Sequence, residues 1–107
     1  MTNWILKTAN YTAQPKDKII GDTRNGAFTV TLPPSPSSNI EVKFLRLGDY
    51  ILNIDFNGSP YGGFMIPPTQ IYINQPYEEV SLVYVDATLG WISTRNNILF
   101  NSANATT

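Results

Sequence analysis

The stretch Phe28-Thr29-Val30-Thr31-Leu32-Pro33 decides the fold of this chain. Phe28, Val30 and Leu32 alternate with two threonines, and successive side chains of a β-strand point to opposite faces. The run therefore places three apolar groups on one face and two β-branched threonines on the other, which suits a pleated surface. Pro33 ends the strand because it has no backbone N–H to donate. We interpret the stretch as a core strand.

Similar period-two runs recur along the rest of the chain. They predict strands over residues 16–23, 27–32, 40–47, 50–56, 69–73, 78–86 and 91–94. The apolar run over residues 4–7 is either a first strand or an arm that packs on a neighbouring subunit. Since no window has a sustained helical period with caps, we expect almost no helix. Short strands at regular spacing are typical of sandwiches and barrels. The fold class predicted is all-β, as a single small antiparallel β-sandwich or barrel-like domain.

The alternation also predicts where the core and the domain boundaries lie. In residues 40–47 the period of Ile40, Val42 and Phe44 breaks at Leu45, which predicts a β-bulge near Phe44-Leu45. The organisation expected is an N-terminal arm over 1–10, a β-domain over 11–94 and a C-terminal tail over 95–107. The residues expected to be largely buried are Phe28, Val30, Leu32, Val42, Phe44, Ile54, Leu82 and Trp91.

Composition excludes several classes of function. The 107 residues include no cysteine and no histidine, which removes disulfides, thiolate nucleophiles, Cys/His metal sites and His-based triads. Charged residues make up only 14% and the net charge is −1, so we expect no nucleic-acid partner. No apolar run approaches the roughly 20 residues that cross a bilayer, and the N-terminus lacks a signal-peptide pattern. We expect no membrane insertion.

The candidate chemistry is sparse. Glu78 and Glu79 are adjacent, so on a strand they would face opposite sides and could not act as an acid/base pair. Residues 53–58 resemble the start of a calcium loop, but the position of the bidentate glutamate holds Phe64. Strand alternation followed by an Asn-Gly turn explains the same residues. We therefore expect no enzyme activity, no metal and no cofactor.

Tyrosines are the remaining candidate binding residues. Exposed together, they would stack on sugars, whereas tyrosine in strands and loops is commonly half-buried filler. The candidate glycan contacts are Tyr50, Tyr61, Tyr72 and Tyr77.

Five short segments in fixed order carry a resemblance to a known family. They are Tyr11-Thr12-Ala13 and Asp22-Thr23 followed by residues 28–33 with Pro36; an Asn-Ile-Asp strand with an Asn-Gly turn over 53–58; and residues 80–92, which close on Gly90-Trp91. Together they resemble a small domain of tail-fibre, neck and baseplate proteins of tailed bacteriophages, frequent in marine and cyanobacterial phages. The resemblance spans about residues 11–94. Pro15-Lys16-Asp17 departs from the family's usual Gly-Asp turn.

The resemblance implies a non-catalytic structural module of the virion, commonly trimeric, assembled in the host cytoplasm. Its implied partners are itself as a homotrimer and other virion proteins; a carbohydrate- or receptor-binding module for a host surface glycan is the alternative on the same fold. Apolar residues at both ends are the candidate oligomer contacts, because exposed apolar clusters usually mark interfaces. They are Trp4, Ile5, Leu6, Ile98, Leu99 and Phe100. The competing expectation is that both ends fold back on their own domain.

Overall fold

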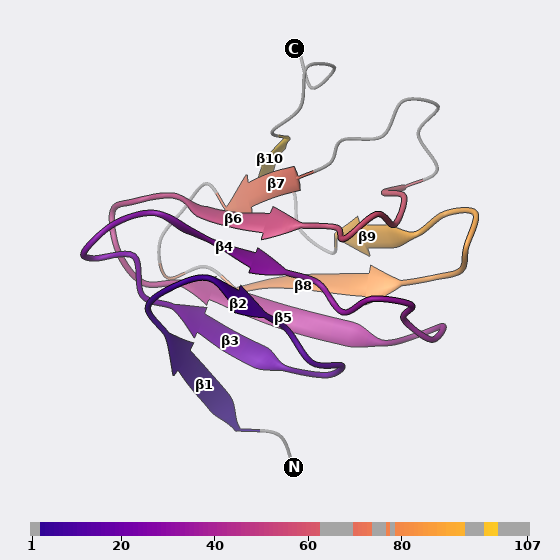
Figure 1. Ribbon diagram of the computed structural model, residues 1–107, viewed down its shortest axis with the longest axis horizontal. Helices are drawn as coiled ribbons and strands as arrows, with labels where there is room; N and C mark the ends of the chain where they lie inside the picture. The colour runs from indigo at the N-terminus through magenta and orange to yellow at the C-terminus, as the bar shows by residue number, and fades with distance from the viewer. Residues whose placement is uncertain (1–2, 63–69, 74–76, 78, 94–97, 101–107) are drawn as a thin grey trace.

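The computed structural model describes residues 3–62, 70–73, 77, 79–93 and 98–100, which form two five-stranded sheets and no helix. Sheet A has the order β1-β3-β5-β8-β9 and sheet B the order β10-β7-β6-β4-β2 (Figure 1). The strands of sheet A are β1 (Trp4–Lys7), β3 (Lys18–Gly21), β5 (Glu41–Arg46), β8 (Glu79–Tyr84) and β9 (Trp91–Ser93). Those of sheet B are β2 (Tyr11–Thr12), β4 (Phe28–Thr31), β6 (Leu52–Asp55), β7 (Gln70–Ile73) and β10 (Ile98–Phe100).

Successive strands of the chain belong alternately to the two sheets over the first half of the fold. From β1 to β6 the chain alternates between them, so each strand of sheet A is followed by one of sheet B. Strands β1, β3 and β5 are consequently parallel neighbours, as are β2, β4 and β6. After β6 the direction reverses, and β7, β8, β9 and β10 add antiparallel pairs to the two sheets. The result is a two-layer, sandwich-like arrangement (Figure 1).

The inward faces of the two sheets form one apolar core. In β4 the burial pattern alternates as the sequence predicts, with Val30 fully buried and Thr29 and Thr31 half-buried. All eight residues predicted to be buried are buried, and Trp91 is among the largest fully enclosed side chains. Burying a large apolar side chain contributes roughly 1.5–3 kcal/mol, so this shared core holds the layers together. The predicted all-β class and core are confirmed.

The purely antiparallel sandwich is wrong, because both sheets are mixed. Parallel neighbours need a long crossover, and short gaps between strands therefore favour hairpins on sequence grounds. Here the crossover between β1 and β3 includes β2, a strand of the opposite sheet. The short loops lead from one sheet to the other rather than to an adjacent strand of the same sheet. The periodicity of the sequence does not distinguish these two kinds of connection.

The bulge expected near Phe44-Leu45 is also wrong. Strand β5 pairs with β8 in an uninterrupted register from Glu41 opposite Val83 to Leu45 opposite Glu79. Its burial alternates without a break, and the inward position after Phe44 is occupied by Arg46. Apolar residues at 45 and 47 suggested that the inward face switches there, but Leu45 lies outward and Arg46 continues the inward face.

Candidate functional site

The loops that leave sheet A lie together at one edge of the sandwich. Because β1, β3 and β5 are parallel neighbours, their carboxyl ends point the same way. The loops over 8–10, 22–27 and 47–51, which lead from them to sheet B, therefore follow one another along that edge (Figure 1). We call these three loops, with Tyr77, the crossover edge. It carries the candidate binding site.

The first feature of this edge is a hollow of about 280 Å³. Two of its residues are strongly exposed aromatics, Tyr50 at 54% and Tyr77 at 71% exposure. Its lining, which we call the aromatic hollow, consists of Arg24, Leu47, Gly48, Asp49, Tyr50 and Tyr77. Tyr50 and Tyr77 are far apart along the chain, so only the fold brings these two predicted tyrosines together.

Arg46 holds in place the backbone that lines the aromatic hollow. Its guanidinium is buried and donates hydrogen bonds to the carbonyls of Gly48 at 2.9 Å, Asp49 at 2.6 Å and Ile73 at 3.1 Å. Its own carbonyl accepts a hydrogen bond of 2.6 Å from the backbone N–H of Tyr77. One residue therefore fixes the chain before Tyr50 and the chain at Tyr77. In the sequence, Arg46 follows the same alternation as the inward residues Val42 and Phe44. This signal could have identified it as an inward residue, but the prediction missed it.

The 22–27 and 47–51 loops of the crossover edge are in close backbone contact. A Cβ on Gly48 would lie 2.5 Å from the backbone nitrogen of Arg24 and 2.6 Å from the carbonyl carbon of Thr23, so only glycine fits there. Arg24 is in turn held by Asp22, whose carboxylate accepts bonds from the guanidinium at 2.8 and 2.9 Å. Together with a hydrogen bond from the backbone N–H of Arg24, these side-chain hydrogen bonds lower the pKa of Asp22 to about 2.

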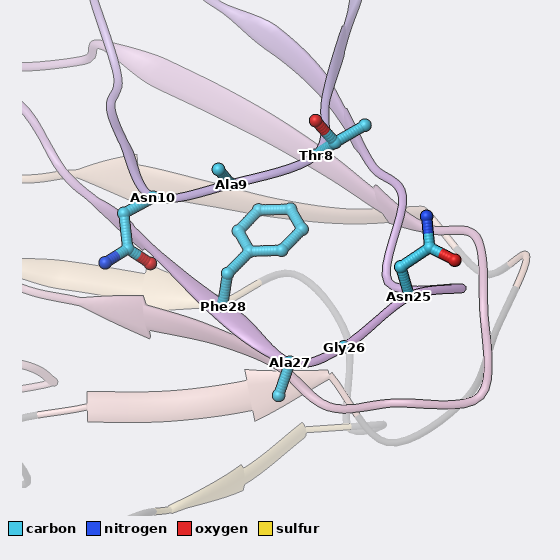
Figure 2. A pocket seen from close by; sticks show the side chains of 7 residues that line it. All are labelled: Thr8, Ala9, Asn10, Asn25, Gly26, Ala27 and Phe28. Atoms are coloured by element: carbon cyan, nitrogen blue, oxygen red, sulfur yellow. The ribbon is translucent and has the colours of Figure 1, made fainter.

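A second hollow of about 450 Å³ lies on the other side of the 22–27 loop. Figure 2 shows the Phe28 ring pointing from β4 toward the 8–10 loop, with Asn10 and Asn25 on either side. The Asn10 side-chain oxygen accepts a 2.9 Å hydrogen bond from the backbone of Thr29, which fixes that amide. We call this the asparagine hollow, lined by Thr8, Ala9, Asn10, Asn25, Gly26, Ala27 and Phe28.

The other two candidate tyrosines do not belong to this edge. Tyr61 is buried and stacks on Phe56, with ring centroids 4.9 Å apart, and burial raises its pKa. Tyr72 is half-buried on β7 and lies opposite Asn53 of β6. The structure therefore brings together two of the four tyrosines, and adds Arg24 and Asp49, which were not among the predicted candidates.

The candidate oligomer contacts at the N-terminus form strand β1. It pairs in parallel with β3 and is one of the two edge strands of sheet A in the described part of the chain, the other being β9. Ile5 packs against the core, whereas Trp4 is 37% and Leu6 55% exposed on the opposite face. Ile98, Leu99 and Phe100 supply the main chain of β10, paired with β7; their side chains lie outside the described part of the structure.

The outward faces of the two sheets differ in character. On sheet A, Leu6, Ile20 and Leu45 are neighbours in register and form an apolar row across three strands. We call the outward apolar residues of this sheet the apolar face: Trp4, Leu6, Ile20, Leu45, Val83 and Ile92. On sheet B the corresponding row is polar, with Thr12, Thr31, Asp55 and Gln70 in register.

Comparison with known proteins gives no family for the chain: no family model matches it, and no curated protein does. Within the described ranges, no three acidic side chains lie close enough to hold a metal ion. The same residues contain no helix that is long and apolar enough to cross a membrane.

Proposed function

We propose that the protein is a non-catalytic structural module of a phage tail fibre, neck or baseplate appendage that assembles as a homotrimer. The appendage and the number three rest on the order of motifs over residues 11–94. Its location would be the virion, after assembly in the host cytoplasm, and its partners would be two further copies and other virion proteins. An assembly function needs surfaces for those contacts rather than a reactive centre.

The observation that carries the proposal is the apolar face. Leu6, Ile20 and Leu45 lie side by side on an outward surface, and Trp4 extends it at the sheet edge. Soluble monomers seldom expose a contiguous apolar surface without using it for contacts. The surrounding charges are balanced, since Lys43 is ion-paired with Glu79 at 3.0 Å on the same face. Such a surface can meet its own copy without like-charge repulsion.

The exposed edge of β1 supports the same conclusion. Edge strands leave a row of backbone groups free to pair with another chain, and proteins usually protect them with charge or proline. Here the strand is Trp-Ile-Leu-Lys, with its only charge at the last position. Association of three copies would cover both this edge and the apolar face.

Light scattering with size-exclusion chromatography tests the proposal. Full-length protein should have the mass of three chains, and Leu6→Glu should shift it to one chain because a carboxylate would be buried in the contact. Thr12→Glu is the matched control, since Thr12 is exposed on the polar side of β2, and it should leave the mass unchanged. A monomer at high micromolar concentration would contradict the proposal. The neighbouring genes should encode tail or baseplate proteins.

A carbohydrate- or receptor-binding module is the second candidate function. The specific observation in its favour is the pair of exposed tyrosines, Tyr50 and Tyr77, in one hollow at the crossover edge. This function is compatible with assembly, because the hollow lies at the loop ends rather than on the apolar face.

A further inference from the structure

The backbone that carries the two tyrosines of the aromatic hollow is fixed by hydrogen bonds to Arg46. Tyr77 has a φ of +63°, a conformation that costs energy for a residue with a side chain and persists only where its surroundings impose it. Its backbone N–H is bound to the carbonyl of Arg46 at 2.6 Å, while the Arg46 side chain holds the carbonyl of Asp49. A preordered site loses less entropy on binding, which favours a ligand role for these exposed rings.

The groups in the hollow define the ligand chemistry. Tyrosine offers an apolar ring face together with a hydroxyl that donates and accepts hydrogen bonds. Beside the rings, the Asp49 carboxylate has no hydrogen-bond partner in the described residues, and the Arg24 side chain is 66% exposed. A sugar ring presents C–H groups to an aromatic face and hydroxyls to a carboxylate or guanidinium. At about 280 Å³ the hollow is at the small end of ligand pockets, which suits one such ring.

The asparagine hollow continues the site. Arg24 lines the aromatic hollow and the next residue, Asn25, lines the asparagine hollow, so both hollows lie against the same 22–27 loop. Asn25, Asn10 and Thr8 offer amide and hydroxyl groups in this hollow, which suits a hydroxylated ligand, while the Phe28 ring is 7% exposed and belongs to the core (Figure 2). A ligand of two or three linked rings would span both hollows.

The charges at the edge select an uncharged ligand. Asp22 neutralises Arg24 through a 2.8 Å ion pair, and the Arg46 guanidinium, which bonds the carbonyl of Asp49, places a positive charge beside the negative Asp49 carboxylate. A carboxylated or sulfated sugar would therefore find no excess of positive charge to bind there. Lys16, Lys18 and Lys43 line a separate hollow together with Glu41, so an acidic glycan would find more positive charge on that surface than at the crossover edge.

We propose that the crossover edge binds a neutral oligosaccharide, with one sugar ring in the aromatic hollow and the next in the asparagine hollow. This inference rests on the carbohydrate-binding alternative above and adds the ligand class and the residues. Tyr50 and Tyr77 stack on the first ring, Asp49 and Arg24 bond its hydroxyls, and Asn25 contacts the second.

An array of neutral, sialylated and sulfated oligosaccharides tests this with the full-length chain. Neutral glycans should bind, and Tyr50→Ala and Tyr77→Asn should each weaken the affinity about tenfold or more, as truncated aromatic anchors do. Asparagine tolerates the positive φ at position 77. Ile51→Ala is the matched control, because Ile51 is 42% exposed beside Tyr50 but does not line the hollow; its affinity should be unchanged. Circular dichroism and the melting temperature verify that each variant is folded.

The outcomes separate this inference from the broader function. Binding of neutral glycans that both tyrosine variants lose, with Asn25→Ala weakening trisaccharides more than monosaccharides, supports it. Binding restricted to sialylated or sulfated glycans, or binding that Tyr50→Ala and Tyr77→Asn leave intact, overturns the inference while carbohydrate binding stands. If no glycan of any class binds, both are overturned, and the assembly function is unaffected.

Discussion

The guanidinium of Arg46 donates a 3.1 Å hydrogen bond to the carbonyl of Ile73 and thereby joins β5 of sheet A to β7 of sheet B. The same group bonds the carbonyls of Gly48 and Asp49, and it occupies an inward position next to the apolar core. A buried charge is tolerated only where its donors are satisfied. Arg46 is therefore a link between the layers and a support for the loop before Tyr50.

Arg46→Ala should destabilise the protein by about 2–4 kcal/mol, because buried carbonyls lose charged hydrogen-bond donors. Lys43→Ala is the matched control on the same strand: Lys43 is partly exposed and paired only with Glu79 among the described residues. Its loss should cost less than about 1 kcal/mol. Urea titration measures both free energies of unfolding, and equal effects would contradict the role given to Arg46.

Leu32→Ala should destabilise by about 2–5 kcal/mol, the range for truncating a fully packed leucine. Leu32 is completely buried, whereas Leu89, in the turn between β8 and β9, is 40% exposed. Leu89→Ala serves as control and should cost under about 0.5 kcal/mol. Denaturant titration checks the pair; a loss under half a kcal/mol at Leu32 would mean that the core can collapse around the missing side chain.

Gly90→Ala should be more harmful than Gly58→Ala. Both glycines have positive φ, +71° and +84°, so both substitutions carry the same kind of backbone penalty. At Gly90 a Cβ would also lie 1.9 Å from the carbonyl oxygen of Pro60, while at Gly58 it meets open space. The difference between their melting temperatures isolates this clash. Equal melting temperatures would show that the Pro60 segment moves away freely.

Stability should fall in acid partly through Asp22. Its pKa is lowered from 3.8 to about 2 in the folded protein by hydrogen bonds from Arg24. The stabilisation is present above the unfolded value and is lost as the pH falls through the folded one. The urea midpoint should therefore drop less between about pH 4 and pH 2 in Asp22→Asn than in wild type. An identical drop in Asp22→Asn would refute this linkage.

The sequence by itself determined seven of the ten described strands and most of the inward residues, whereas β2 and β10 were not predicted and β1 was expected as either a strand or an arm. Apolar and polar residues alternate so regularly in β4 and β6 that Val30 and Ile54 have only one face to bury. Glycine, asparagine and proline between the runs end the strands at nearly the observed positions. These are local effects of side-chain direction and backbone geometry, which neighbouring residues specify.

Tertiary structure alone decided how the strands are arranged and where the site lies. A strand period of two does not say whether a short loop leads to an adjacent strand or to the opposite sheet, and here it leads from β1 to β2 and from β3 to β4 across the sandwich. That winding aligns the carboxyl ends of β1, β3 and β5 and brings Tyr50 beside Tyr77. Arg46 escaped prediction for the same reason, since the carbonyl of Ile73 that it bonds is 27 residues away along the chain.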